Sequence, residues 1–187
     1  DLLSAILPTY YIIANAEATA NHSNLDGLRF GVQKDGKEID EVMSASRTAG
    51  FGKQIRKRFV IGSFALFVEN QDKLFRKAQK VRRLIVEDLK NALGGIDGLI
   101  APASAGVAPK LSDTSMDQLS STYLIAENYM VMGNFSGYPS VTLPMGYCDG
   151  LPVGVNLTCK LYDEQTTLNL ALAIEQATGL ADQIKEV

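Results

Sequence analysis

Apolar residues recur at helical spacing most clearly between Gln71 and Leu93. Within that stretch the apolar positions follow one another at intervals of four, three, four and four residues, at Leu74, Ala78, Val81, Ile85 and Leu89. This period is typical of a helix that buries one face. The pattern therefore predicts an amphipathic helix over Gln71–Leu93.

Further helices are predicted at both ends of the chain and before its last apolar strands. The first covers Leu2–His22, where Pro8 is expected to kink or break the helix. Another covers about Met116–Met132. The last is a helix that Asp163 caps and Gly179 ends.

Short apolar runs rich in β-branched residues predict strands between these helices. One is Leu28–Val32, with glycine-bearing turns on each side, and another is a buried, parallel-type strand over Gly98–Ala101. Two more flank the loop "YCDGLP" within Asn134–Leu157, which indicates a hairpin. Helices alternating with strands predict an α/β fold with some antiparallel pairing, in one domain spanning residues 1–187.

Composition and charge exclude several classes of protein. The 187 residues are 46% hydrophobic and 21% charged, which is typical of a globular protein. A net charge of −3 gives no attraction of the whole protein for nucleic acid or an anionic membrane. The longest apolar run, Phe59–Val68, is too short to span a bilayer. No signal peptide is visible at the start of the chain, and we expect a cytoplasmic protein. The chain looks like a piece of something longer.

The two cysteines do not have the spacing of a metal or redox site. Cys148 and Cys159 are expected to be two buried free thiols, although a hairpin could also bring them together. We expect no metal site.

Two other features resemble a catalytic residue and a phosphate-binding loop, but a structural role is expected for each. His22 is the only histidine, and no Gly-x-Ser-x-Gly elbow accompanies it, so a surface or capping role is expected. The segment "GFGKQI" (Gly50–Ile55) resembles a phosphate loop but lacks the third glycine and a preceding strand. A helix start is expected there.

Basic residues form the main positive density of the sequence. They are Arg56–Arg58, Lys73, Arg76, Lys77, Lys80, Arg82 and Arg83. A solvated helix face is the usual meaning of such a run, and a strip facing RNA or protein is the alternative.

Arg58 differs from its basic neighbours because it directly precedes an apolar run and is expected to point inward. A guanidinium can bind a substrate carboxylate through two parallel hydrogen bonds. Glu127, in the mostly apolar segment "YLIAENYMVMG", could bind an ammonium group. If both face one cavity, they could hold the two ends of a zwitterion.

Five stretches of the sequence, taken in order, resemble the amidase signature family, and most closely the A subunits of the aspartyl/glutamyl-tRNA amidotransferases. They are "YYIIANAEATANHSNLDGLRFG" (Tyr10–Gly31), "GFGKQIRKRFVIGSFAL" (Gly50–Leu66), "KAQKVRRLI" (Lys77–Ile85), "GNFSGYPSVTLPMG" (Gly133–Gly146) and "LPVGVNL" (Leu151–Leu157).

This resemblance implies an α/β/α sandwich around a mixed central sheet. It also implies hydrolysis of glutamine by a Lys–Ser–Ser arrangement, with the released ammonia used to amidate mischarged tRNA. In the family those three residues lie in an upstream Gly/Ser-rich segment, and no such stretch occurs in this chain. The chain therefore resembles a C-terminal portion that is inactive alone. The implied partners are glutamine, the B and C subunits and, through the complex, mischarged tRNA. No cofactor is implied for this chain, because ATP and Mg²⁺ belong to a partner subunit.

The resemblance also carries over a substrate pocket, but no nucleophile. Arg58 matches an arginine that holds the α-carboxylate of glutamine, and Tyr10 matches a tyrosine near the same substrate. Glu127 stands where the family has an aspartate for the α-ammonium group. The sequence also departs from the family at "TAN" (Thr19–Asn21) and at Asn156, where glutamine is common.

The segment before the hairpin has a structural role under this resemblance. Gly137 and Pro139 set the angle at which the chain passes from a helix into a core strand. Two other functions remain open: a stand-alone amidase of another small amide, and a non-catalytic binding module.

Overall fold

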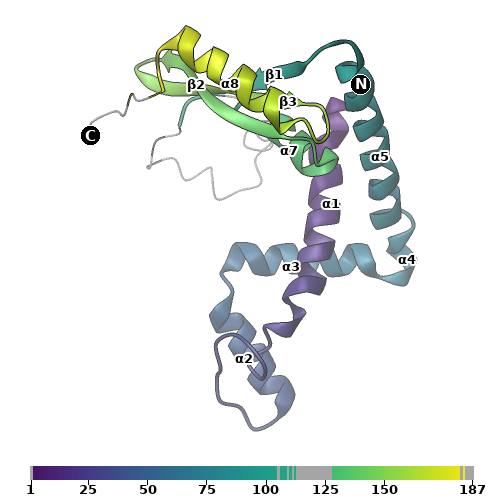
Figure 1. Cartoon of the computed structure of the whole chain (residues 1–187). Helices are drawn as coiled ribbons and strands as arrows, with labels where there is room; N and C mark the ends of the chain where they lie inside the picture. Colours follow the sequence, from purple (N-terminus) through teal and green to yellow (C-terminus); the bar gives the residue numbers. More distant parts are fainter. Residues whose placement is uncertain are drawn as a thin grey trace. The chain divides into compact units, whose positions relative to one another are not determined.

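The computed structural model describes residues 2–104, 106–108, 110, 112, 128–181 and 183. The chain divides into two compact units, one of Pro8–Val81 and the other of Asp1–Leu7 with Arg82–Val187. The first unit is helical, and the second contains the strands (Figure 1). The longer helices are α1 (Leu3–Asn21), α2 (Ile39–Gly50), α3 (Lys53–Leu66), α5 (Phe75–Ala92), α7 (Asn128–Ser136) and α8 (Glu164–Thr178). The shorter helical turns are η1 (His22–Asn24), α4 (Val68–Gln71) and η2 (Leu93–Gly95).

The first helix runs through its proline. Pro8 lies inside α1 and does not break it, contrary to one of the two expectations. Proline removes one backbone hydrogen bond from a helix. Apolar side chains on both sides of it, Ile6, Leu7 and Ile13, are buried, and this packing keeps the segment helical.

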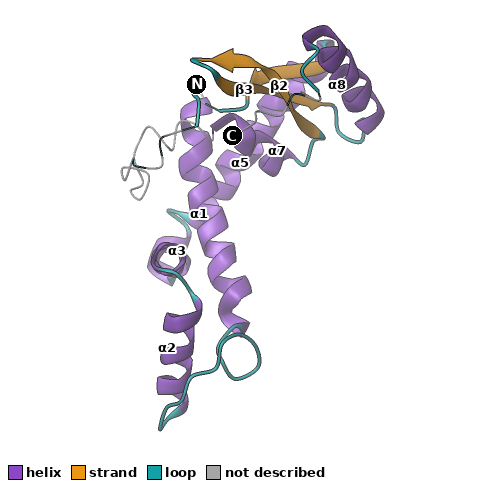
Figure 2. Ribbon diagram, turned by 90° about the vertical axis from the view of Figure 1, so that its left-hand side faces the viewer, coloured by secondary structure: helices purple, strands orange, loops and turns teal. Residues whose placement is uncertain are grey.

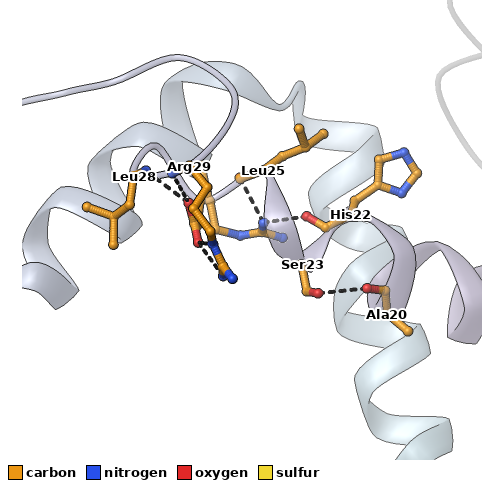
Figure 3. Close-up of polar contacts among 8 residues, drawn as sticks. Ala20, His22, Ser23, Leu25, Leu28 and Arg29 are labelled. Carbon is orange, nitrogen blue, oxygen red and sulfur yellow. Dashed lines mark hydrogen bonds and ion pairs between the residues drawn. The ribbon is translucent and has the colours of Figure 1, made fainter.

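The strand predicted at Leu28–Val32 is not formed, and a local turn takes its place. Oδ1 of Asp26 accepts hydrogen bonds from the backbone N–H groups of Leu28 (2.9 Å) and Arg29 (3.1 Å), as Figure 3 shows. The glycines at 27 and 31 have φ of 80° and 90°, which a strand does not allow. Side-chain hydrogen bonds of this kind offer the backbone an alternative to a sheet ladder.

The predicted amphipathic helix is confirmed as α5, preceded by the short α4. Three of the five periodic residues, Ala78, Ile85 and Leu89, are buried. The basic residues of the same helix lie mainly on its exposed side. Of the helix predicted at Met116–Met132, only the part from Asn128 onward lies within the described residues, and it forms α7.

The described sheet has three antiparallel strands in the order β1 (Gly98–Pro102), β3 (Leu151–Cys159) and β2 (Ser140–Cys148). The prediction of a buried parallel-type strand at Gly98–Ala101 is therefore wrong, because β1 pairs antiparallel to β3 and is half-exposed. A short apolar run is consistent with a strand, but it does not determine the direction of the partner strand. Both views show α8 lying along this sheet (Figures 1 and 2).

The hairpin is confirmed and its turn has two residues. Asp149 and Gly150, with φ of 51° and 74°, connect β2 to β3. Two successive positive φ values match the twist of a hairpin turn.

Cys148 is exposed beside this turn and Cys159 is buried at the far end of β3, so the expectation of two buried thiols is wrong for Cys148.

The two faces of the sheet differ in chemistry. The face toward α8 is apolar: Leu143, Leu157 and Cys159 of the strands form a buried cluster with Ala171 of α8. On the other face Asn156 accepts a hydrogen bond from Ser140 Oγ (2.9 Å) and donates one to Thr142 Oγ1 (3.1 Å). Residues two apart along a strand share a face, which explains this separation.

The ends of two elements behave as predicted from the sequence. Asp163 Oδ1 accepts a hydrogen bond from the N–H of Thr166 at the start of α8, and Gly179 ends that helix with a φ of 65°. After α7, Gly137 has a φ of 70° and leads through Pro139 into β2.

Among the described residues, no helix combines the length and apolar character that crossing a membrane requires.

Candidate functional site

Helices α1 and α3 cross within the helical unit (Figure 1). Gly62 of α3 lies against the carbonyl oxygen of Asn15 and the hydroxyl of Thr19, both on α1. The Thr19 hydroxyl hydrogen-bonds to the carbonyl oxygens of Asn15 (2.8 Å) and, across the crossing, of Phe59 (3.2 Å). Glycine is needed here because its missing side chain lets the two backbones approach. The crossing fixes the helix that contains Arg58.

Arg58 extends from α3 to an aromatic pair on α1. Its guanidinium carbon lies 5.4 Å from the centroid of the Tyr11 ring. Tyr10 contacts Tyr11 edge to face, with ring centroids 5.7 Å apart and ring planes at 71°. All three side chains are half-buried. This set of three, Tyr10, Tyr11 and Arg58, is called the tyrosine–arginine cluster below.

The cluster contains two of the three predicted site residues. Arg58 and Tyr10 are predicted from the resemblance, and the fold joins them through Tyr11. Glu127 lies outside the described residues. No described acidic side chain lies within ion-pair distance of Arg58. Tyr11 was not among the predicted site residues, and the only signal for it in the sequence is its position next to Tyr10.

The only histidine belongs to a second aromatic group in the same unit. His22 is exposed, and its ring packs 6.2 Å from Phe51 and 5.8 Å from Phe59, measured between centroids. Arg47 lies over both phenylalanine rings and donates hydrogen bonds from Nη1 to the carbonyl oxygens of His22 (2.8 Å) and Leu25 (3.0 Å). These contacts hold the loop after α1 against α2, a structural role that matches the expectation of a surface histidine.

The glycine-rich segment at residues 50–55 starts a helix, as expected. Gly52 is the residue before the first turn of α3, with an extended backbone. The strand that a dinucleotide site needs before its glycines is absent here, because α2 precedes the segment.

The basic residues between positions 73 and 83, which lie on α5 or just before it, divide into two groups. Those at 73, 76, 77, 80 and 83 are exposed, which fits a solvated face. Arg82 is the exception, because its Nε and Nη2 donate hydrogen bonds of 3.1 and 3.0 Å to the carbonyl oxygen of Phe135, in the last turn of α7. Its guanidinium also lies 5.6 Å from the centre of the Phe135 ring. A positive charge near the C-terminus of a helix is stabilising, so Arg82 fixes α7.

Within the part of the chain that the structure describes, no three His, Cys, Asp or Glu side chains are grouped as metal ligands. The chemistry that the tyrosine–arginine cluster offers is recognition of an anion by a guanidinium supported by an aromatic ring.

Comparison with known proteins agrees with the sequence resemblance. The family model described as Amidase matches residues 1–168. The A subunit of the glutamyl-tRNA(Gln) amidotransferase of Rhodospirillum rubrum is 38% identical over 178 residues, which cover 95% of this chain and 35% of the relative. The crystal structure of the corresponding protein from Thermotoga maritima matches with a TM-score of 0.65 and 28% identity, over 95% of this chain and 33% of that one.

A more distant structural match shows the fold alone. The structure of 6-aminohexanoate cyclic dimer hydrolase matches 95% of this chain with a TM-score of 0.70, at 17% identity, and 36% of that enzyme is covered. The chain thus spans about a third of the length of the relatives that it matches. Since the family model covers most of its residues, the chain belongs to the amidase signature family.

Proposed function

We propose that this chain is the C-terminal portion of a longer amidase-signature domain, in the glutamine-hydrolysing A subunit of a tRNA-dependent amidotransferase. Relatives with that name are 36–38% identical over nearly the whole chain. In this proposal the complete domain is an α/β/α sandwich, and its Lys–Ser–Ser residues lie outside this chain. The segment supplies the glutamine pocket and does not hydrolyse glutamine alone.

The observation that supports this proposal is the tyrosine–arginine cluster. Glutamine is a zwitterion, so its recognition requires a cation for the α-carboxylate and an acceptor for the α-ammonium group. Arg58 would bind the carboxylate, Tyr10 would line the same pocket, and Glu127 would bind the ammonium group. A guanidinium that no described carboxylate neutralises is a suitable partner for such an anion.

The reaction in this proposal is hydrolysis of the glutamine side-chain amide to glutamate and ammonia in the complete protein. The ammonia would pass to the B subunit, which would use ATP and Mg²⁺ to amidate Glu-tRNA(Gln), with the C subunit completing the complex. This chain needs no cofactor for its own part, and the proposed location is the cytoplasm.

The test is the glutaminase activity of the complete protein after Arg58→Ala. We expect the KM for glutamine to rise at least tenfold, which corresponds to about 1.4 kcal/mol or more. The matched control is Arg56→Ala, which removes an exposed arginine from the same helix and should leave the KM within about twofold.

An unchanged KM in Arg58→Ala would refute the pocket assignment. Competition experiments separate the alternatives, because a preference for amides without an α-carboxylate and α-ammonium group would favour a stand-alone amidase. Arg58→Ala without effect on any function would favour a non-catalytic binding module.

A further inference from the structure

The Tyr11 ring lies between the two residues predicted for the pocket. Its centroid is 5.4 Å from the guanidinium carbon of Arg58, and its neighbour Tyr10 contacts it edge to face. Arg58 and Tyr11 come from different helices, so their contact depends on the crossing of α1 and α3. At the glycine at position 62, one turn after Arg58, the backbone of α3 lies directly against α1.

A ring placed over the face of a guanidinium orients it without occupying its donors. The guanidinium is planar, and its N–H groups point outward within that plane. Stacking on an aromatic face therefore fixes the plane and leaves the edges open to a carboxylate, which binds in the plane through two parallel hydrogen bonds. A flexible arginine without such a support loses side-chain entropy when it binds a ligand.

We propose that Tyr11 is a positioning residue for substrate binding: its ring holds the guanidinium of Arg58 in the plane that a carboxylate requires. This inference rests on the proposed function, because it assumes that Arg58 binds the α-carboxylate of glutamine. The ring is the part that acts, and the hydroxyl group is not needed for this role. The edge-to-face contact with Tyr10 holds the Tyr11 ring in turn.

The experiment measures the glutamine KM and kcat of the complete protein in a double-mutant cycle of Tyr11→Leu and Arg58→Ala. We expect Tyr11→Leu to raise the KM about three- to tenfold with kcat kept within about twofold. Tyr11→Phe keeps the ring and should retain the wild-type KM. In the Arg58→Ala background, Tyr11→Leu should raise the KM no further, because the group that Tyr11 orients is already gone.

The outcomes separate failure of this inference from failure of the proposed function. If Arg58→Ala itself leaves the KM unchanged, the proposed pocket is wrong and this inference is overturned with it. If Arg58→Ala raises the KM but Tyr11→Leu does not, or if the effect of Tyr11→Leu persists without Arg58, Tyr11 has no positioning role. If Tyr11→Leu does not fold, Tyr11→Met fills the site with a flexible side chain and serves in the same cycle.

Discussion

The helix crossing at Gly62 determines whether α3 can hold Arg58 against α1, and Gly62→Ala tests it directly. A Cβ atom at this position would overlap the carbonyl oxygen of Asn15 and the hydroxyl of Thr19. The first of these belongs to a helix backbone, so it cannot rotate away, and the two helices would have to separate. Separation also weakens the 3.2 Å hydrogen bond from the Thr19 hydroxyl to the carbonyl oxygen of Phe59.

The expected change in the free energy of unfolding combines one stabilising effect and two destabilising effects. Replacing glycine by alanine inside a helix stabilises by about 1 kcal/mol through helix propensity. Overpacking costs about 1–3 kcal/mol, and the weakened hydrogen bond costs about 0.5–1.5 kcal/mol. We therefore expect Gly62→Ala to lower the free energy of unfolding by about 0.5–3.5 kcal/mol, because the clash and the weakened hydrogen bond together outweigh the gain in propensity.

The assay is a urea titration of the complete protein, combined with hydrogen exchange of the amides in α1 and α3. The matched control is Gly50→Ala at the end of α2, where an added Cβ would meet only the Val32 side chain at an ordinary 3.9 Å. That variant should be neutral or stabilised by up to about 1 kcal/mol. If Gly62→Ala is as stable as Gly50→Ala, and its amides exchange no faster, the close crossing is not what holds these helices.

Two further predictions concern other contacts. Arg82→Gln should destabilise the protein by about 1.5–3 kcal/mol in a urea titration, because it removes two charge-assisted hydrogen bonds to the carbonyl oxygen of Phe135. The control Arg83→Gln removes only an exposed ion pair and should cost no more than about 0.5 kcal/mol. Equal effects of the two substitutions would contradict the role of Arg82. Hydrogen bonds from the backbone N–H of Arg29 and from the Arg29 side chain hold the pKa of Asp26 well below its ordinary value. Ionised Asp26 therefore stabilises the folded state above about pH 4, and this stabilisation is lost as the pH falls through the lowered pKa. The stability difference between wild type and Asp26→Asn, measured by urea titration at pH 7 and pH 3, should therefore shrink on acidification; a constant difference would contradict it.

Local patterns in the sequence were sufficient for elements that are stabilised by their own residues. The period of Leu74, Ala78 and Ile85 predicts α5, since a helix repeats every 3.6 residues whatever it packs against. Asp163 and Gly179 predict the ends of α8 because capping involves only neighbouring backbone groups. The family resemblance placed Arg58 and Tyr10 in one pocket, and the structure brings them into one cluster, although their part in substrate binding stays a prediction.

Contacts between distant segments were decided by the tertiary structure alone. The direction of β1 depends on its partner β3, more than fifty residues away in the chain, and an apolar run says nothing about that direction. The failure of the strand at Leu28–Val32 depends on Asp26, whose side chain satisfies the backbone in place of a neighbouring strand. Likewise the sequence puts Tyr11 and Arg58 nearly fifty residues apart, and only the close approach of α1 and α3 at a glycine brings the ring and the guanidinium together. Sequence periodicity determines which residues form helices, because helix hydrogen bonds join neighbouring residues. Strand pairing and the packing of backbones against one another join distant segments, so only the tertiary structure decides which strands pair and which side chains meet.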